Sequence, residues 1–255
     1  MAALKRIDWP PLVLGALILA AWECVPLATG SRDFPPLHRV LAALIANGPL
    51  LAAELAHTLR RALAGFALAL VVTVPLGILI GRLRALAFVL EPVIDLLRPL
   101  PPLALVPIVM LFAGIGDAAK ISVVAYAAAF PLLIHAIDGV RGIHPMYQTV
   151  ARTLRLSRRE QMLLVDLPAA LPVIVTGIRI AITFALLVAV SSEMLMSTDG
   201  IGSFIFQSQE RFRMADGLAA ILVVAVTGLL LNRGLLAVEQ RLLGWHRAVT
   251  GARSS

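Results

Sequence analysis

Six long apolar stretches divide this sequence, and they limit the possible folds more than any other feature. A helix needs about 20 mainly apolar residues to cross roughly 30 Å of hydrocarbon, and it satisfies its backbone hydrogen bonds internally. Hydrophobic residues make up 60% of the chain and charged residues 15%, which is far more apolar than a soluble domain. We therefore expect an all-α, polytopic membrane protein with one transmembrane domain over residues 1–255 and six spans, at residues 11–27, 62–80, 100–112, 121–137, 173–196 and 217–236.

Two of the predicted spans carry signals about helix shape and packing. Gly77 and Gly81, four residues apart in the second span, predict close approach of a neighbouring helix. Because proline lacks a backbone N–H and disturbs a helix, we expect the third span to be broken or tilted and supported by its neighbours. The prolines in and beside it are Pro99, Pro101, Pro102 and Pro107.

The segment between the first two spans, residues 34–61, is only moderately apolar, and Asn-Gly-Pro at residues 47–49 interrupts it. We expect two helices here, at residues 37–46 and 50–60, lying at the outer face of the membrane. A seventh span is the competing interpretation, although charged and polar side chains would make it costly in lipid. These side chains are Glu54, His57, Arg60 and Arg61.

Lysine and arginine are distributed unequally between the two sides of the predicted spans. If the N-terminus is cytoplasmic, the inner segments hold twelve of these residues and the outer segments seven, while three lie at or within span ends. The excess of basic residues on the cytoplasmic side predicts that both termini are cytoplasmic. Lys5-Arg6 before an apolar run also fits a signal peptide, but no small-x-small cleavage site follows.

A charged segment, which we call the basic loop (residues 141–170), lies between the fourth and fifth predicted spans. Pro145 suits the first turn of a helix that runs to about residue 154. Ser157 and Glu160 have the spacing of a capping box and predict a second short helix, before two prolines bend the chain into the fifth span. Two helices with a basic flank suit the docking of a soluble partner, and a loop resting on anionic lipid headgroups is the alternative.

The spacing of seven residues in the basic loop carries a family resemblance. They are Thr149, Val150, Ala151, Arg155, Val165, Leu167 and Pro168. Their register resembles the cytoplasmic motif of permease subunits of binding-protein-dependent ABC importers, which reads Glu-Ala-Ala, three residues, Gly, nine residues, Ile, one residue, Leu-Pro. Arg155 stands at the glycine position, where a left-handed conformation costs other residues about 1 kcal/mol. We therefore expect Arg155 to sit in a tighter right-handed turn or to extend a helix.

Two further stretches narrow the resemblance to one branch. Arg-Pro-Leu-Pro-Pro-Leu-Ala at residues 98–104 with Gly-Ile-Gly at 114–116, and Thr-Gly-Ile-Arg-Ile at 176–180, look like the nitrate, sulfonate and taurine permeases. The resemblance implies a MetI-like type I importer fold with cytoplasmic coupling helices in the bacterial inner membrane. It also implies a homodimer, two cytoplasmic ATPase subunits that bind ATP and Mg²⁺, and an extracytoplasmic substrate-binding protein.

The resemblance further implies which part of the basic loop contacts the ATPase. These docking residues are Thr149, Val150, Ala151, Arg152, Arg155, Ser157, Arg158, Arg159, Glu160, Val165, Leu167 and Pro168.

Ionisable, polar and aromatic residues near the spans are candidates for the translocation pathway or a gate. For Arg179 the alternatives are that it lines this route, extends to the surface or forms an interhelical ion pair. For Glu193 they are that it acts in a gate or makes a hydrogen bond between helices. Residues 197–215 form an outer gate, a docking site for the binding protein, or a plain connecting loop. The candidates are Arg98, Arg179, Ser191, Ser192, Glu193, Phe204 and Phe206.

The favoured function is the permease subunit of an ATP-driven importer that moves a small anion, such as a sulfonate, taurine or nitrate, by alternating access. A proton-coupled transporter or channel is the alternative, and it would work without an ATPase. An intramembrane enzyme is a third class, but the spans hold no paired aspartates or Ser-His set. We predict no catalytic residue, metal site or cofactor in this chain, because its histidines lie far apart and residues 114–120 lack the pattern of a phosphate loop. The net charge of +7 reflects cytoplasmic arginines rather than nucleic-acid binding.

Overall fold

The computed structural model describes residues 9–30 and 33–242, and these residues form helices joined by turns, without a strand. The elements are α1 (Trp9–Thr29), α2 (Leu37–Ala46), α3 (Gly48–Arg82), α4 (Arg84–Leu97), η1 (Pro102–Leu105), α5 (Val106–Ala113), α6 (Asp117–Arg141), α7 (Pro145–Thr153), α8 (Arg158–Gln161), η2 (Met162–Asp166), α9 (Leu167–Met196), α10 (Ile201–Glu210) and α11 (Met214–Leu242).

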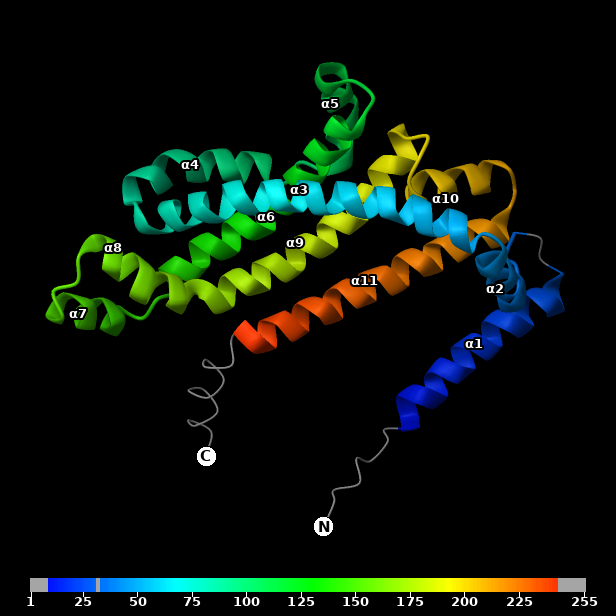
Figure 1. Ribbon diagram of the computed structural model, residues 1–255, viewed down its shortest axis with the longest axis horizontal. Helices are drawn as coiled ribbons and strands as arrows, with labels where there is room; N and C mark the ends of the chain where they lie inside the picture. The colour runs from blue at the N-terminus through cyan, green and yellow to red at the C-terminus, as the bar shows by residue number, and fades with distance from the viewer. Residues whose placement is uncertain (1–8, 31–32, 243–255) are drawn as a thin grey trace, which may run out of the picture.

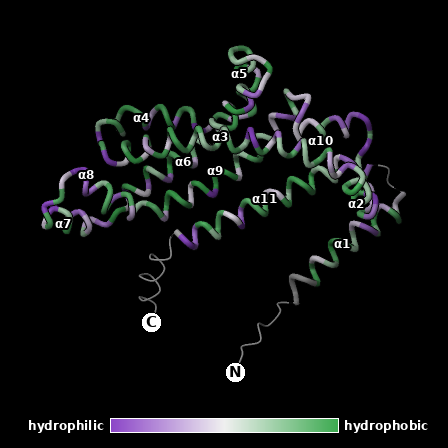
Figure 2. Tube along the Cα trace, viewed as in Figure 1, coloured by the Kyte–Doolittle hydropathy of each residue, from purple (hydrophilic) through white to green (hydrophobic). Residues whose placement is uncertain are grey.

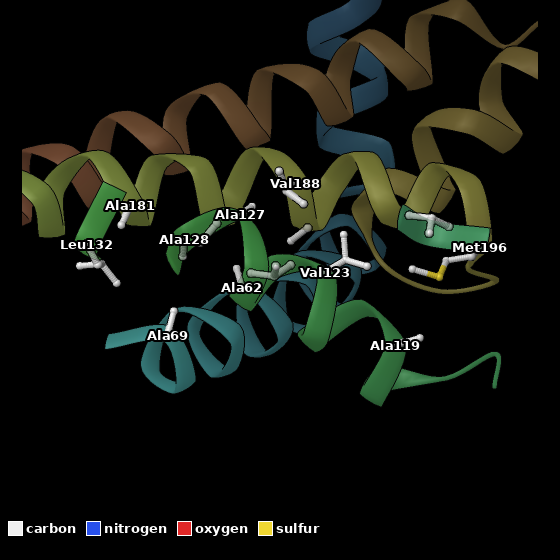
Figure 3. Close-up of a cluster of buried hydrophobic side chains, with 14 residues drawn as sticks. Ala62, Ala69, Ala119, Val123, Ala127, Ala128, Leu132, Ala181, Val188 and Met196 are labelled. Atoms are coloured by element: carbon white, nitrogen blue, oxygen red, sulfur yellow. The ribbon is translucent and has the colours of Figure 1, made fainter. Parts of the chain in front are cut away.

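Helices α3, α6 and α9 lie side by side and form the centre of the molecule (Figure 1). A core of small and branched side chains, mostly alanine and valine, joins all three helices (Figure 3). Small residues let helix backbones approach closely, so van der Waals contact can hold helices together where lipid supplies no hydrophobic driving force. Helix α11 runs beside α9, and α2 and α10 pack against α11 at one end of the bundle.

Glycines of α3 set the distance between α3 and α6. A Cβ atom added at Gly77 would lie 2.6 Å from the Cβ atom of Ala136, and one added at Gly81 would lie 2.9 Å from the Cβ atom of Val140. Real Cβ atoms do not approach so closely, so only glycine fits at these positions. The close packing predicted from Gly77 and Gly81 is confirmed.

Four helical segments of the described chain are long and apolar enough to cross a membrane. They are α3, α6, the continuous path from α8 to α9 (Arg158–Met196), and α11 over Met214–Arg241. Helix α4 and the η1–α5 pair (Pro102–Ala113) meet at 87° and together can supply a fifth. The prolines therefore coincide with a sharp break, and α4 with η1–α5 forms either a broken span or a re-entrant loop. The prediction for this span omitted α4. The described apolar part of α1, Val13–Thr29, is shorter, so the six predicted spans are not confirmed.

The helix predicted for residues 37–46 is confirmed as α2, but the separate outer helix predicted for residues 50–60 is wrong. Helix α3 runs without interruption for 35 residues, and Pro49 is accommodated in its first turn. The charges that argued against a helix entering the membrane here are neutralised by partners, since the buried Arg61 forms ion pairs with three acidic residues.

No interruption separates the basic loop from the fifth span, and the bend expected at the two prolines stays a prediction. Helix α8 continues through the π-helical turn η2 into α9. Pro168 lies in the first turn of α9, and Pro172 lies inside that helix. A π turn rearranges the local backbone hydrogen bonds, so the helical path can pass the prolines without ending. One continuous helical path therefore joins the basic loop to α9.

Segments predicted for the two sides of the membrane gather at opposite ends of the molecule. Helices α7 and α8 lie at one end, and α2 and α10 lie at the other (Figure 1). Hydrophilic residues are frequent at both ends, while α1, α9 and α11 are mainly hydrophobic between them (Figure 2). This arrangement agrees with the predicted alternation of sides. Lys5 and Arg6, two of the twelve basic residues counted for the cytoplasmic side, lie outside the described residues.

We expect Gly77→Ala to destabilise the protein, because the new methyl group would overlap Ala136 and lie 2.8 Å from the carbonyl oxygen of Leu133. Overpacking of this kind costs about 1–3 kcal/mol, so the thermal unfolding midpoint of the detergent-solubilised protein should fall by several degrees. Gly234→Ala is the control, because nothing lies within 4 Å of the position of its added Cβ and alanine favours a helix. Equal losses in the two variants would contradict the packing argument.

Candidate functional site

The first helix of the basic loop, α7, ends in a Schellman motif. Arg155 has a φ angle of 51°, and its N–H donates to the carbonyl oxygen of Arg152 at 3.0 Å. The N–H of Leu156 donates to the carbonyl oxygen of Ala151 at 3.1 Å. The predicted right-handed turn or helix extension at Arg155 is therefore wrong. Arg155 keeps the left-handed conformation of the glycine that it replaces, because the two hydrogen bonds offset a cost of about 1 kcal/mol.

The second helix, α8, begins with the predicted capping box. The N–H of Glu160 donates to the hydroxyl oxygen of Ser157 at 3.3 Å, and the N–H of Ser157 donates to the Glu160 carboxylate at 2.8 Å. Two backbone donors at the helix start are thus satisfied by side chains, which stiffens the tip of the loop. The capping box is confirmed.

The surface of the basic loop combines positive charge with exposed apolar groups. Its five exposed arginines are Arg141, Arg152, Arg155, Arg158 and Arg159. The exposed apolar side chains of α7 and its C-cap, each at least half exposed, are Met146, Tyr147, Val150 and Leu154. An apolar strip beside charged side chains is the composition of a protein docking surface.

Most of the predicted docking residues lie between α7 and the end of α8. Thr149 and Val150 are exposed on α7, whereas Ala151 is buried. The segment from Ser157 to Glu160 is exposed at the start of α8. Three of the predicted docking residues lie in η2 and the first turn of α9, where the loop joins that helix: Val165, Leu167 and Pro168.

An ion pair at the base of the basic loop was not anticipated from the sequence. Asp166 is 5% exposed, and one of its oxygens lies 3.4 Å from a guanidinium nitrogen of Arg82 at the end of α3. Arg82 also donates to the carbonyl oxygen of Arg158 at 3.4 Å. The other oxygen of Asp166 has no hydrogen-bond partner among the described residues. Arg82 therefore ties α3 to both ends of the α8–η2 segment. A lone aspartate in an apolar run is the signal that could have identified this position.

At the opposite end of the bundle, five charged residues form what we call the outer charge cluster. Its members are Arg61, Asp117, Lys120, Glu193 and Asp199. The Arg61 side chain is 2% exposed and donates to Glu193 at 2.7 Å, to Asp117 at 2.7 Å and to Asp199 at 2.6 Å. Lys120 lies 3.3 Å from Asp199.

The outer charge cluster holds the loop between α9 and α10 against α3 and α6. Burial alone would raise the pKa of Asp199, but hydrogen bonds from Ser197 and Arg61 and the charges of Arg61 and Lys120 lower this pKa well below its ordinary value. The Asp199 carboxylate is therefore charged at neutral pH and anchors the loop. Of this cluster, sequence analysis named only Glu193 as a pathway candidate, and Arg61, Asp117 and Lys120 are distant from it along the chain.

The structure places Glu193 and its neighbouring serines inside the protein or against their own helix. Glu193 is fully buried and accepts hydrogen bonds from the Thr58 hydroxyl at 2.7 Å and the Gly202 N–H at 3.2 Å. The hydroxyls of Ser191 and Ser192 donate to carbonyl oxygens of α9. Glu193 thus makes the helix–helix hydrogen bond that was one of its two predicted roles.

The segment after α9 forms a helix that packs against the bundle. Helix α10 contacts α9 and α11, and Phe204 packs beside the buried Ile201 and Ile205. Phe206 is 41% exposed. A gating or docking role for Phe204 and Phe206 stays a prediction.

Arg179 and Arg98, two basic residues predicted for the pathway, have different surroundings. Arg179 lies 3.3 Å from Glu239 of α11, which is the interhelical ion pair considered as an alternative. Arg98 lies at the end of α4 and lines a cavity of about 340 Å³ with residues of α6 and α9. His135 of α6 lines the same cavity. Among the described residues Arg98 has no acidic partner. The cavity thus combines an exposed arginine that has no acidic partner with a mainly apolar lining.

Comparison of the sequence with protein families gives a match over residues 73–244 to the family described as binding-protein-dependent transport system inner membrane component. The taurine transport system permease protein of Escherichia coli (strain K12) is 34% identical over 92% of this chain and 89% of its own length. A putative aliphatic sulfonates transport permease protein of Bacillus subtilis (strain 168) is 32% identical over 97% and 91%. A nitrate import permease protein of Synechocystis is 31% identical over 90% and 87%.

Solved structures support the same arrangement of helices. An inward-facing structure of the MetNI methionine ABC transporter matches with a TM-score of 0.69 at 16% identity, covering 77% of this chain and 98% of that chain. An amino acid ABC transporter matches with a TM-score of 0.66, covering 78% of this chain and 97% of that chain, also at 16% identity. At this identity the likeness concerns the fold alone.

We expect Arg155→Gly to raise the thermal unfolding midpoint. Glycine adopts a positive φ angle without the steric cost of about 1 kcal/mol that arginine carries. Arg152→Gly is the matched control, because it places glycine within α7 and should lower the midpoint. A fall in stability for Arg155→Gly as large as that for Arg152→Gly would contradict the left-handed assignment.

Glu193→Ala should be strongly destabilising, because it leaves the buried Arg61 without one of its three acidic partners. Removal of one member of a buried ion pair costs about 3–5 kcal/mol. Glu91→Ala, which removes the partner of the exposed Arg141, should change stability by less than about 1 kcal/mol. The comparison uses thermal unfolding and the yield of monodisperse protein, and similar effects for the two variants would refute a structural role for the Arg61–Glu193 pair.

Proposed function

Because this chain belongs to the family of binding-protein-dependent transport system inner membrane components, we propose that it forms the membrane path of an ATP-driven importer for a small anion. The predicted family and the MetI-like type I importer fold are confirmed. The relatives named for taurine, aliphatic sulfonates and nitrate support an anionic solute, and a bicarbonate transport permease of Synechococcus elongatus adds a fourth anion. The single observation that supports coupling to ATP is the exposed basic loop, whose second helix continues without a break into α9.

In this proposal the basic loop is the contact with a separate ATPase. The apolar strip of α7 and the arginines around it form the docking surface, and the Schellman motif and capping box keep that surface rigid. A force applied at α8 is transmitted along η2 to α9, because no break separates them. The pair between Arg82 and Asp166 carries the same displacement to α3. Movement of packed helices between two arrangements then alternates access to the two sides.

The proposal assigns partners and a location to this chain. Two ATPase subunits bind ATP and Mg²⁺ in the cytoplasm, and an extracytoplasmic binding protein delivers the anion. Both termini of the permease are cytoplasmic, so that the basic loop faces the ATPase. A second copy of the permease covers the apolar side chains that α4 and α5 expose, among them Phe88, Leu96, Leu111 and Phe112. This chain performs translocation and no hydrolysis.

We expect the double variant Arg158→Glu/Arg159→Glu to lose copurification with the ATPase and to lose ATP-dependent uptake. Both side chains are exposed at the start of α8, where glutamate is favourable for a helix N-terminus, so the fold should persist. The control Arg211→Glu/Arg213→Glu changes the same number of exposed charges after α10, at the other end of the molecule, and should keep the ATPase.

The measurements are pull-down of the ATPase and solute uptake into vesicles that hold permease, ATPase and binding protein. Uptake by the permease alone, without an ATPase or nucleotide, would overturn the proposal and favour a secondary transporter or channel.

A further inference from the structure

The cavity beside Arg98, which we call the Arg98 cavity, lies between the end of α4 and the middle of α6 and α9, and its volume is about 340 Å³. We infer that this cavity binds an organic sulfonate, with the sulfonate group on Arg98 and the hydrocarbon part against the apolar wall, in preference to nitrate or bicarbonate. The inference rests on the proposed importer function and assigns a solute class to this chain's own membrane path.

The charge of Arg98 is available to a ligand. The buried or half-buried basic residues Arg61, Lys120 and Arg179 all lie within ion-pair distance of carboxylates. Arg98, which is exposed beside the cavity, has no such partner among the described residues, and it is the one arginine among the residues that line this cavity. A guanidinium group presents several N–H donors in a planar fork that matches the oxygens of an oxoanion. An anion entering the cavity would therefore complete an interaction that the protein leaves open.

The backbone beside Arg98 is held in position from α6. The hydroxyl of Tyr126 donates to the carbonyl oxygen of Leu97 at 2.6 Å, at the end of α4, and the Tyr126 ring packs edge-on against Phe130 with centroids 5.1 Å apart. This contact satisfies a terminal helix carbonyl and fixes the point from which the Arg98 side chain starts. The backbone that carries Arg98 is thus fixed before a ligand arrives, which reduces the entropy lost on binding.

His135 offers a second polar group on the same wall. Its Nδ1 lies 2.8 Å from the carbonyl oxygen of Pro131, and since a carbonyl can only accept, Nδ1 is the donor and this hydrogen bond fixes the orientation of the ring. Helix α9 approaches this histidine closely at Gly177, where an added Cβ atom would lie 2.6 Å from the Cβ atom of His135. This close approach explains why glycine stands in the Thr-Gly-Ile-Arg-Ile stretch, because it allows α9 to form one wall of the cavity.

The remaining lining selects for a hydrocarbon part. Phe130, Ile134, Ile180 and Phe184 lie around the cavity, and its lining is otherwise mainly apolar. Nitrate and bicarbonate have no carbon chain to place there, so they would lose hydration without gaining apolar contact. Each methylene that an alkanesulfonate buries should instead increase the affinity by about fourfold. The lining thus distinguishes anions that carry the same charge.

The test measures ligand binding by the full-length permease in complex with its ATPase and without the binding protein. The readout is the thermal unfolding midpoint in potassium methanesulfonate, propane-1-sulfonate, hexane-1-sulfonate, nitrate and bicarbonate at equal ionic strength. We expect the half-saturating concentration to fall by about fourfold per methylene until the cavity is filled, with no saturable effect of nitrate or bicarbonate. Equal effects of all five anions, or no stabilisation by hexane-1-sulfonate, would overturn the inference.

Variants separate the contribution of the sulfonate group to the affinity from that of the hydrocarbon chain. Arg98→Gln should abolish saturable stabilisation, and Arg98→Lys should restore part of it. Phe184→Ala should keep binding but reduce the gain per methylene, which a purely structural role of Phe184 would not do. Arg233→Gln on α11 removes an exposed arginine outside the cavity lining and is the control.

ATP-dependent uptake by the complete transporter is measured in parallel. Uptake without a preference for sulfonates would contradict only this inference, whereas uptake that does not depend on ATP would contradict the proposed function.

Discussion

The outer half of this protein depends on the pairing of Arg61 with Glu193 inside the helix bundle. Their side chains are 2% and 0% exposed, and a buried charge without a partner would cost several kcal/mol. Helices α3 and α9 must therefore meet in the one register that brings the two charges together. The same register allows Asp117, Lys120 and Asp199 to complete the outer charge cluster, so α6 and the loop before α10 are positioned by it as well.

A second ion pair stabilises the opposite end of α3. Arg82 reaches Asp166 at the base of the basic loop, so helix α3 carries one charged anchor at its C-terminal end and another, Arg61, in its first half. Between the anchors, α3 contacts α6 through glycine, alanine and valine. Apolar contacts are not directional, whereas ion pairs are specific in distance and partner. This division suits a helix that must stay connected at two points while the packing between them changes.

The basic loop and the Arg98 cavity lie on the same two helices, α6 and α9, or directly beside them. The loop continues into α9 through η2, and α9 supplies Ile180 and Phe184 to the cavity wall. Gly177 lies between the loop and these residues, at the close contact with His135. One continuous helical path therefore links the loop to the cavity wall, which provides a physical connection between the proposed ATPase contact and the proposed anion site.

The sequence by itself determined what depends on local chemistry: the apolar helices, the break at the prolines after Arg98, the α2 helix and the Ser157–Glu160 capping box. The tertiary structure decided the continuity of α3, the conformation of Arg155 and the membership of the outer charge cluster. Arg61 looked too costly for a helix in lipid because Glu193 lies 132 residues away along the chain. The free energy of a buried charge depends on its partners, and only the folded chain brings those partners within reach.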